Sequence, residues 1–390
     1  MSPYIIALRT AYIAFPFVAL ALTFPYVLYQ YHKYGSLMAY RIVVVYTFWF
    51  YVLCMCFLVS LPLPTFEEVS RMTDNMVRLV PFQFLTDIRH EADIAVAGWD
   101  LQTLSAVVHT QTFFEVAANI VMMIPFGIYL HYYFRQSWPK VMVLGFCMSL
   151  FFEVSQITAL FGIYPRPYRY FDVDDLICNT AGAVAGSWIT PLCTFFLPKR
   201  EKLDELSYER GRNVTFLRRL TGMIMDMGVT AVACVVLYYL IKNSTHIVEP
   251  GSDLYTRCVF LFKIYIVWVL AYFCVVPAVS GGMTAGRHIV GLRLVNDDGS
   301  RANPLRIMIR QMIVYYVVMP APGYAFLSYV ILSYYPSGWQ RIACVWAICL
   351  FMLIMLLYIC DIFVNTLARH NKLFYDRLSG TKYISFRTHE

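Results

Sequence analysis

The stretch IACVWAICLFMLIMLLYIC, residues 342–360, holds nineteen consecutive residues without a single charge. A helix needs about 20 mostly apolar residues to cross the hydrocarbon core of a bilayer. This run therefore predicts a membrane-spanning helix, and the same pattern recurs along the chain. We predict nine spans, over residues 4–30, 38–62, 113–134, 139–160, 175–197, 217–241, 259–280, 309–335 and 341–366.

The composition agrees with a membrane protein that crosses the bilayer many times. Of the 390 residues, 59% are hydrophobic and only 14% are charged, and the mean hydropathy is +0.59. Soluble globular domains carry about 25% charged residues. Because the alternating pattern of a membrane barrel is absent, we predict an all-α, polytopic bundle of about nine transmembrane helices.

Lysine and arginine gather in three segments, which are 198–219, 287–306 and the tail from 369 onward. Cytoplasmic loops carry an excess of these residues. Nine alternating spans place all three segments in the cytoplasm, so we expect a multi-pass protein of the cell membrane with its N-terminus outside and its C-terminus inside. The acidic loop 63–112 then lies outside. The net charge of +7 is a signal of orientation in the lipid bilayer, and we expect no nucleic-acid partner.

The run PKREKLDELSYERGRN, residues 198–213, is the most polar part of the chain. It predicts a boundary between two modules. We expect a five-span membrane domain over 1–197, a basic cytoplasmic linker over 198–216, and a four-span domain with a cytoplasmic tail over 217–390. No internal repeat relates the two halves, so the sequence does not support an inverted-repeat transporter.

In the first domain, polar residues gather near the outer ends of the third, fourth and fifth spans. A carboxylate within a span is a candidate for function, because charge is unfavourable in lipid. Gly182 and Gly186 are four residues apart, a spacing that permits close approach of two helices. We expect the polar residues to converge on one outward-opening pocket between the third, fourth and fifth spans, with the helices closing beneath it at the two glycines. The candidate ligand-binding residues are Asn119, Glu153, Gln156, Arg169, Asp172, Asp174, Asp175 and Asn179.

A structural interpretation of these residues stays open beside the functional one. Asp174 and Asp175 begin a predicted helix, where carboxylates are favoured as caps. Arg169 then neutralises Asp172, and the asparagines join neighbouring helices. Glu153 is harder to explain in this way, because it lies inside the fourth span.

Three motifs of this domain resemble the VanZ-like family. They are NIVMMIPFG (119–127), EVSQ (153–156) and RYFDVDDLICNTAGAVAG (169–186), and they match the family pattern in order and spacing. The resemblance covers roughly residues 40–197. It implies an integral membrane module associated with low-level resistance to the lipoglycopeptide teicoplanin.

The second domain also carries charged residues in and near its spans. Arg219 and Asp226 are seven residues apart and therefore share a helix face, with Asp226 about 13 Å into its span. Arg219, Arg310 and His288 are alternative partners for Asp226. The segment GLRLVNDDGS, residues 291–300, predicts a small cytoplasmic β-hairpin that turns at Asp298 and Gly299.

The segments GGMTAGRHIVGLRLVNDDGSRANP (281–304) and FYDRLSGTKYI (374–384) resemble the RDD family. The resemblance covers about 216–385. It maps the arginine and the two aspartates that give the family its name to Arg219, Asp226 and Asp376. Transport or ion exchange is the activity that the resemblance implies.

Three functions follow from these features. The first is an envelope protein that binds or handles a lipid-linked ligand at the outer leaflet and is linked to teicoplanin resistance. The second is a transporter or ion exchanger that uses Glu153 and Asp226. An enzyme, such as a metal-assisted lipid hydrolase, is the least favoured, because no histidine lies in the acidic cluster and no nucleophile motif appears. We expect no cofactor and no metal, and as partner an envelope lipid or lipid-linked precursor; no oligomeric state is indicated.

Overall fold

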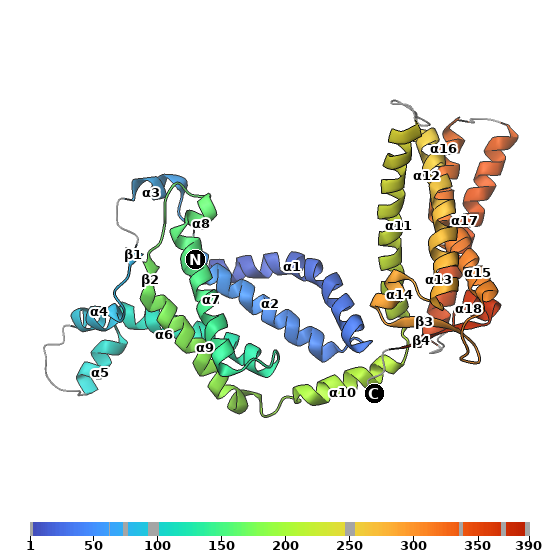
Figure 1. Ribbon diagram of the computed structural model, residues 1–390. Coiled ribbons are helices and arrows are strands. Elements are labelled where there is room, and N and C mark those ends of the chain that lie inside the picture. Colours follow the sequence, from blue (N-terminus) through green and yellow to red (C-terminus); the bar gives the residue numbers. More distant parts are fainter. Residues whose placement is uncertain are drawn as a thin grey trace. The chain divides into compact units, whose positions relative to one another are not determined.

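The computed structural model describes residues 3–61, 63–72, 77–92, 101–245, 254–334, 338–367 and 372–386. The chain divides into two compact units (Figure 1). The first contains Met1–Thr23 and Met38–Leu203, and the second contains Phe24–Leu37 and Asp204–Glu390. The end of the first helix thus belongs to the second unit.

Within the described ranges, eight helices are long and apolar enough to cross a membrane, and a bent pair raises this number to nine if it counts as one span. The pair is Pro304–Val318 with Ala321–Ser333, bent by 40°. It takes the place of the predicted span 309–335, whose last residue lies outside the described ranges. The all-α, polytopic fold is therefore confirmed.

The first unit is built on five long helices. They are α1 (Pro3–Tyr34), α2 (Ala39–Ser60), α6 (Gln111–Tyr132), α7 (Trp138–Ile157) and α9 (Val173–Thr194). Many of their large apolar side chains face outward, among them Trp188 and Leu192 of α9. Exposed apolar faces of this extent suit contact with lipid.

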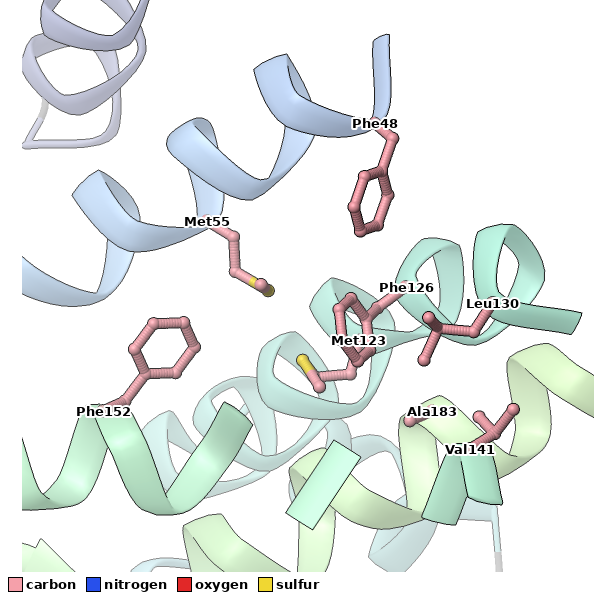
Figure 2. Packing of buried hydrophobic residues seen from close by; sticks show 8 residues of the cluster. All are labelled: Phe48, Met55, Met123, Phe126, Leu130, Val141, Phe152 and Ala183. Atoms are coloured by element: carbon pink, nitrogen blue, oxygen red, sulfur yellow. The ribbon is translucent and has the colours of Figure 1, made fainter. Parts of the chain in front are cut away.

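The interior of this unit is filled by apolar side chains from four helices. Figure 2 shows Phe48 and Met55 of α2 pointing toward Met123 and Phe126 of α6, with Phe152 of α7 beside them. All five side chains are buried. This core fixes α2, α6 and α7 around the polar residues described below.

Glycines allow α6 and α9 to pack closely. A Cβ atom on Gly182 would lie 2.2 Å from the carbonyl oxygen of Ile120, and one on Gly186 would lie 2.1 Å from that of Ile124. No larger residue fits at these positions without moving a helix. The close approach predicted from the spacing of the two glycines is confirmed.

The predicted outer loop 63–112 contains short helices. The short elements of the unit are α3 (Phe66–Arg71), β1 (Val77–Arg78), α4 (Gln83–Glu91), α5 (Leu101–Val108), α8 (Ala159–Gly162) and β2 (Phe171–Asp172). Thr65 and Glu68 explain the start of α3, because each side chain accepts a hydrogen bond from the backbone amide of the other, at 3.2 and 2.7 Å. Strands β1 and β2 pair in parallel.

The predicted linker 198–216 is largely helical, since α10 spans Arg200–Arg212. The second unit continues with α11 (Phe216–Thr245), α12 (Leu254–Val269), η1 (Leu270–Val275), α13 (Val276–Ser280), α14 (Ala285–Ile289), β3 (Leu292–Asn296), α15 (Pro304–Met312), η2 (Ile313–Val318), α16 (Ala321–Tyr334), α17 (Trp339–Leu367), α18 (Phe374–Ser379) and β4 (Thr381–Ser385). Figure 1 shows the short elements α14, α18, β3 and β4 gathered at one end of the long helices.

The prediction of a β-hairpin over 291–300 is wrong for the second strand. The first strand and the turn are present, but β3 pairs antiparallel with β4 near the end of the chain. After the turn, only Arg301 returns to bridge Val295. Asn303 then caps α15 with its side chain, and Pro304 occupies the first turn of that helix. The chain becomes helical before a second strand can form.

Candidate functional site

The acidic cluster of the first unit is centred on the start of α9. Asp172 is the N-cap of this helix, and its Oδ1 accepts a hydrogen bond of 2.8 Å from the backbone amide of Asp174. Burial raises the pKa of Asp172 above its ordinary value, and the charge of Asp174 adds to the shift. Arg78 lies 3.9 Å from the carboxylate. The structural interpretation places the caps at Asp174 and Asp175 and pairs Asp172 with Arg169. In the structure Asp172 itself caps α9, and the cation beside it is Arg78.

The side chain of Asp174 contacts the start of α4 and not its own helix. Its two carboxylate oxygens accept hydrogen bonds from the backbone amides of Phe82 and Phe84, at 2.5 and 3.0 Å. These amides begin α4, so Asp174 caps a second helix from outside. Because both of its oxygens are engaged, Asp174 is the member of the cluster with the clearest structural role.

Asp175 faces the neighbouring helices. Asn119 of α6 donates a hydrogen bond of 2.5 Å to its Oδ1. Ser149 of α7 donates to its backbone carbonyl at 3.3 Å and accepts from Asn179 Nδ2 at 3.0 Å. Ser149 was not among the predicted site residues, although it lies four residues before Glu153 on one face of α7. These polar contacts join α6, α7 and α9.

Glu153 lies within reach of the same helix start. Its side chain is buried, with 2% of its surface exposed, and its Oε2 accepts a hydrogen bond of 2.9 Å from the backbone amide of Asp172. Among the described residues, no donor contacts Glu153 Oε1 or Asp175 Oδ2. Two carboxylates on neighbouring helices thus each keep one oxygen for a further partner.

Arg169 and Gln156 complete the predicted set. Arg169 donates a hydrogen bond of 2.7 Å to the carbonyl of Val59, and its charge also acts on Glu153 and Asp175. Gln156 is buried on α7, three residues after Glu153. In the described part of the chain, no three His, Cys, Asp or Glu side chains are arranged to hold a metal ion.

The predicted residues of the first unit therefore divide into two groups. The hydrogen bonds connect Asn119, Asp175 and Asn179 across three helices and connect Glu153 to Asp172. Asp174 instead faces α4. The carboxylate oxygens of Glu153 and Asp175 in the first group suit a cationic partner.

In the second unit, Asp226 does not pair with the cations considered for it. It is buried, and its oxygens accept hydrogen bonds from Tyr272 Oη at 2.8 Å, Thr284 Oγ1 at 2.6 Å and the backbone amide of Gly286 at 2.8 Å. Hydroxyl and amide groups therefore occupy the place at Asp226 that was predicted for Arg219, Arg310 or His288. Thr284 and Gly286 belong to the segment 281–304, where a contact of this kind was not expected.

Asp376 is the acid that meets arginines. Its Oδ2 accepts from Arg219 Nη1 at 2.9 Å, and its Oδ1 accepts from Arg310 Nε at 2.8 Å. The carboxylate is fully buried and also caps α18 through the backbone amide of Leu373. Of the three residues mapped by resemblance, Arg219 and Asp376 therefore form one ion pair, while Asp226 lies in a separate hydrogen-bond network.

Comparison with known protein families identifies both halves of the chain. The model of the VanZ/LLP1 family matches residues 48–194, and that of the RDD family matches residues 214–380. No curated protein and no solved structure matches the chain. The two matched ranges contain the acidic cluster and the buried ion pair, respectively. The chain is thus an integral membrane protein that carries a VanZ-like domain and an RDD-family domain in tandem.

Proposed function

We propose that the VanZ-like domain binds a cationic group of a lipid-linked envelope ligand at the outer leaflet, and that this binding supports resistance to teicoplanin. The observation that carries the proposal is the pair Glu153 and Asp175. Each is a carboxylate with one oxygen that no described donor contacts. Glu153 is buried and Asp175 is partly buried, and a carboxylate removed from water is unfavourable without compensating charge. Arg169 acts on both groups, and a ligand cation would supply the second positive charge.

The hydrogen bond to Asp172 does not by itself require an acid at position 153. The backbone amide of Asp172 is a donor, and the carbonyl oxygen of a glutamine would accept from it equally well. A carboxyl group in a membrane helix therefore calls for a second explanation. A functional role is the default expectation for such a group.

The orientation predicted from lysine and arginine supports a site at the outer leaflet. The basic segments 198–219, 287–306 and the tail from 369 onward favour the cytoplasmic side. With the N-terminus outside and the C-terminus in the cytoplasm, the start of α9 faces outward. Lipid-linked precursors of the envelope are used on that side of the membrane, which agrees with the resistance that the VanZ-like resemblance implies.

Lipid co-purification tests the proposal directly. The full chain and the variants Glu153→Gln and Asp175→Asn are purified in detergent, and bound lipids are identified by mass spectrometry. We expect an envelope lipid enriched with the wild type and lost from both variants. Glu67→Gln is the matched control, because Glu67 is exposed on α3 and pairs only along its own helix with Arg71, among the described contacts. Equal lipid recovery from all four proteins would overturn the proposal.

Ion or proton transport is the second candidate, favoured by one observation. Each unit holds a carboxylate within a predicted span, Glu153 in the first and Asp226 in the second, with 2% and 1% of the residue surface exposed. Flux measured in proteoliposomes separates the two functions. Transport predicts a pH-coupled flux that Glu153→Gln abolishes while lipid co-purification stays unchanged, whereas ligand binding predicts the loss of the lipid.

A further inference from the structure

Three arginines of the second unit converge on one tyrosine ring. The guanidinium carbons of Arg219, Arg287 and Arg310 lie 4.8, 5.6 and 4.7 Å from the ring centre of Tyr383. They come from α11, α14 and α15, and Tyr383 belongs to β4. All these elements meet at the end of the unit where the short elements gather (Figure 1). Like charges at such spacing repel each other, so the cluster needs compensating negative charge.

The nearby carboxylates supply only part of this charge. Asp376 contacts Arg219 and Arg310, and Asp226 is held by hydroxyl and amide donors. Among the described residues, three guanidinium groups thus face two carboxylates. The cluster retains an excess of one positive charge in a buried region, where charges are normally paired.

Arg287 shows where the missing negative charge belongs. It has 3% of its surface exposed, and its Nη1 donates to the carbonyl of Gly282 at 3.3 Å. Its Nη2 is shielded from solvent and has no hydrogen-bond partner among the described residues. A buried guanidinium N–H without an acceptor is unfavourable, so this nitrogen indicates an acceptor that the chain itself does not provide.

A cavity lies at this position. Its volume is about 20 Å³, and Arg287 lines it together with Arg219, Asp226 and Arg310. The rest of the wall is formed by leucine, valine, methionine, phenylalanine and tyrosine side chains. A water molecule needs about 10–15 Å³ of such volume. The cavity therefore has room for one water or one atom-sized ion, and is too small for a phosphate or carboxylate group.

We propose that this cavity binds a single small monovalent anion of the halide class, such as chloride. Arg287 Nη2 donates to the anion, and the charges of Arg219 and Arg310 stabilise it across the cavity. One negative charge balances the excess of the cluster, which a water molecule does not. The anion then fixes α11, α14 and α15 against β4. This site is independent of the ligand proposed for the VanZ-like domain.

Thermal unfolding of the purified full chain tests the site, with chloride as the probe. Chloride is titrated against gluconate at constant ionic strength, and the unfolding midpoint is followed. A ligand that binds only the folded state raises this midpoint with concentration. We expect a saturable rise with chloride for the wild type and none for Arg287→Gln. Arg306→Gln is the control, because Arg306 is exposed on α15 and lies outside the cavity wall.

A second variant keeps the test decisive if Arg287→Gln does not fold. Arg287→Lys retains the charge but loses the fork of donors, so chloride should bind about tenfold more weakly, as expected for one lost hydrogen bond to a charged group. The proposal is overturned if the wild type unfolds at the same midpoint in chloride and gluconate, which indicates water alone. It is also overturned if Arg287→Lys binds chloride as tightly as the wild type.

Discussion

Glu153 of α7 accepts a hydrogen bond of 2.9 Å from the backbone amide of Asp172, the residue that caps α9. The one contact links the acid inside the fourth span to the start of the fifth. It explains why the motifs at 153–156 and 169–186 belong together: they meet at this bond. The bond requires only an acceptor oxygen, which a glutamine would also supply. The carboxyl group at position 153 is therefore the basis of the proposed function.

The packing of α6 against α9 makes the first prediction. Gly186→Ala places a methyl group 2.1 Å from the carbonyl oxygen of Ile124. The two helices must move apart, and overpacking of this kind typically costs about 1–3 kcal/mol. Thermal unfolding of the purified variant should show a lower midpoint. Gly228→Ala is the control, since nothing lies within 4 Å of the added Cβ; a Gly186→Ala midpoint equal to that of the control would refute the close contact.

The contact between Asp174 and α4 makes the second prediction. Asp174→Asn keeps one acceptor oxygen and loses the other, so one of the amides of Phe82 and Phe84 loses its partner. The loss of a helix cap typically costs about 0.5–2 kcal/mol. Hydrogen exchange at Phe82 and Phe84 should become faster, while exchange within α6 stays the same. Unchanged exchange at both amides would show that Asp174 does not hold α4.

The third prediction concerns Asp376. Asp376→Asn removes the charge that Arg219 and Arg310 share, and breaking a buried ion pair from one side typically costs about 3–5 kcal/mol. The variant should be less abundant in the membrane and should unfold at a lower temperature than the wild type. Asp298→Asn serves as the comparison, because Asp298 is exposed in the turn after β3. Equal abundance and stability of the two variants would contradict the buried ion pair.

The fourth prediction concerns orientation. Reporters fused at positions 205 and 385 should be cytoplasmic, and one inserted near position 80 should lie outside, because lysine and arginine favour the cytoplasmic side. Position 248, which should also be outside, falls beyond the described residues. Accessibility of each reporter to a membrane-impermeant reagent measures its side. If positions 80 and 205 report the same side, the alternation of spans is wrong.

Much of the fold follows from the sequence because the bilayer imposes a length on each apolar run. The cap of α9 was predicted at Asp174 and Asp175, although the structure places it at Asp172. The spans and the α6–α9 approach at Gly182 and Gly186 were accessible from the sequence. The contacts of Asp174 were not, because its partners lie about 90 residues earlier in the chain. A carboxylate at a helix start suggests a cap for its own helix, and no local pattern indicates a second one.

Partners that lie far apart in the sequence also explain the wrong predictions in the second unit. The alternation of Leu292 and Leu294 predicts a strand, but the strand that pairs with it, β4, begins at Thr381. Local turn chemistry favoured the nearer partner. The arginine cluster could be predicted from the sequence only in part. Arg219 and Arg310 were considered as partners for Asp226, whereas in the structure both form ion pairs with Asp376. Arg287 carries no local signal that separates it from the other basic residues of its loop.

Survival under teicoplanin tests the central claim, that Glu153 and Asp175 bind a ligand rather than only hold helices together. A host that lacks its own copy expresses the wild type, Glu153→Gln, Asp175→Asn or the control Glu67→Gln at equal membrane abundance. Both site variants keep shape and hydrogen-bonding capacity, so they should fold. We predict that the wild type and Glu67→Gln protect the cells while Glu153→Gln and Asp175→Asn do not. Protection by both site variants as strong as that by the wild type would contradict the claim.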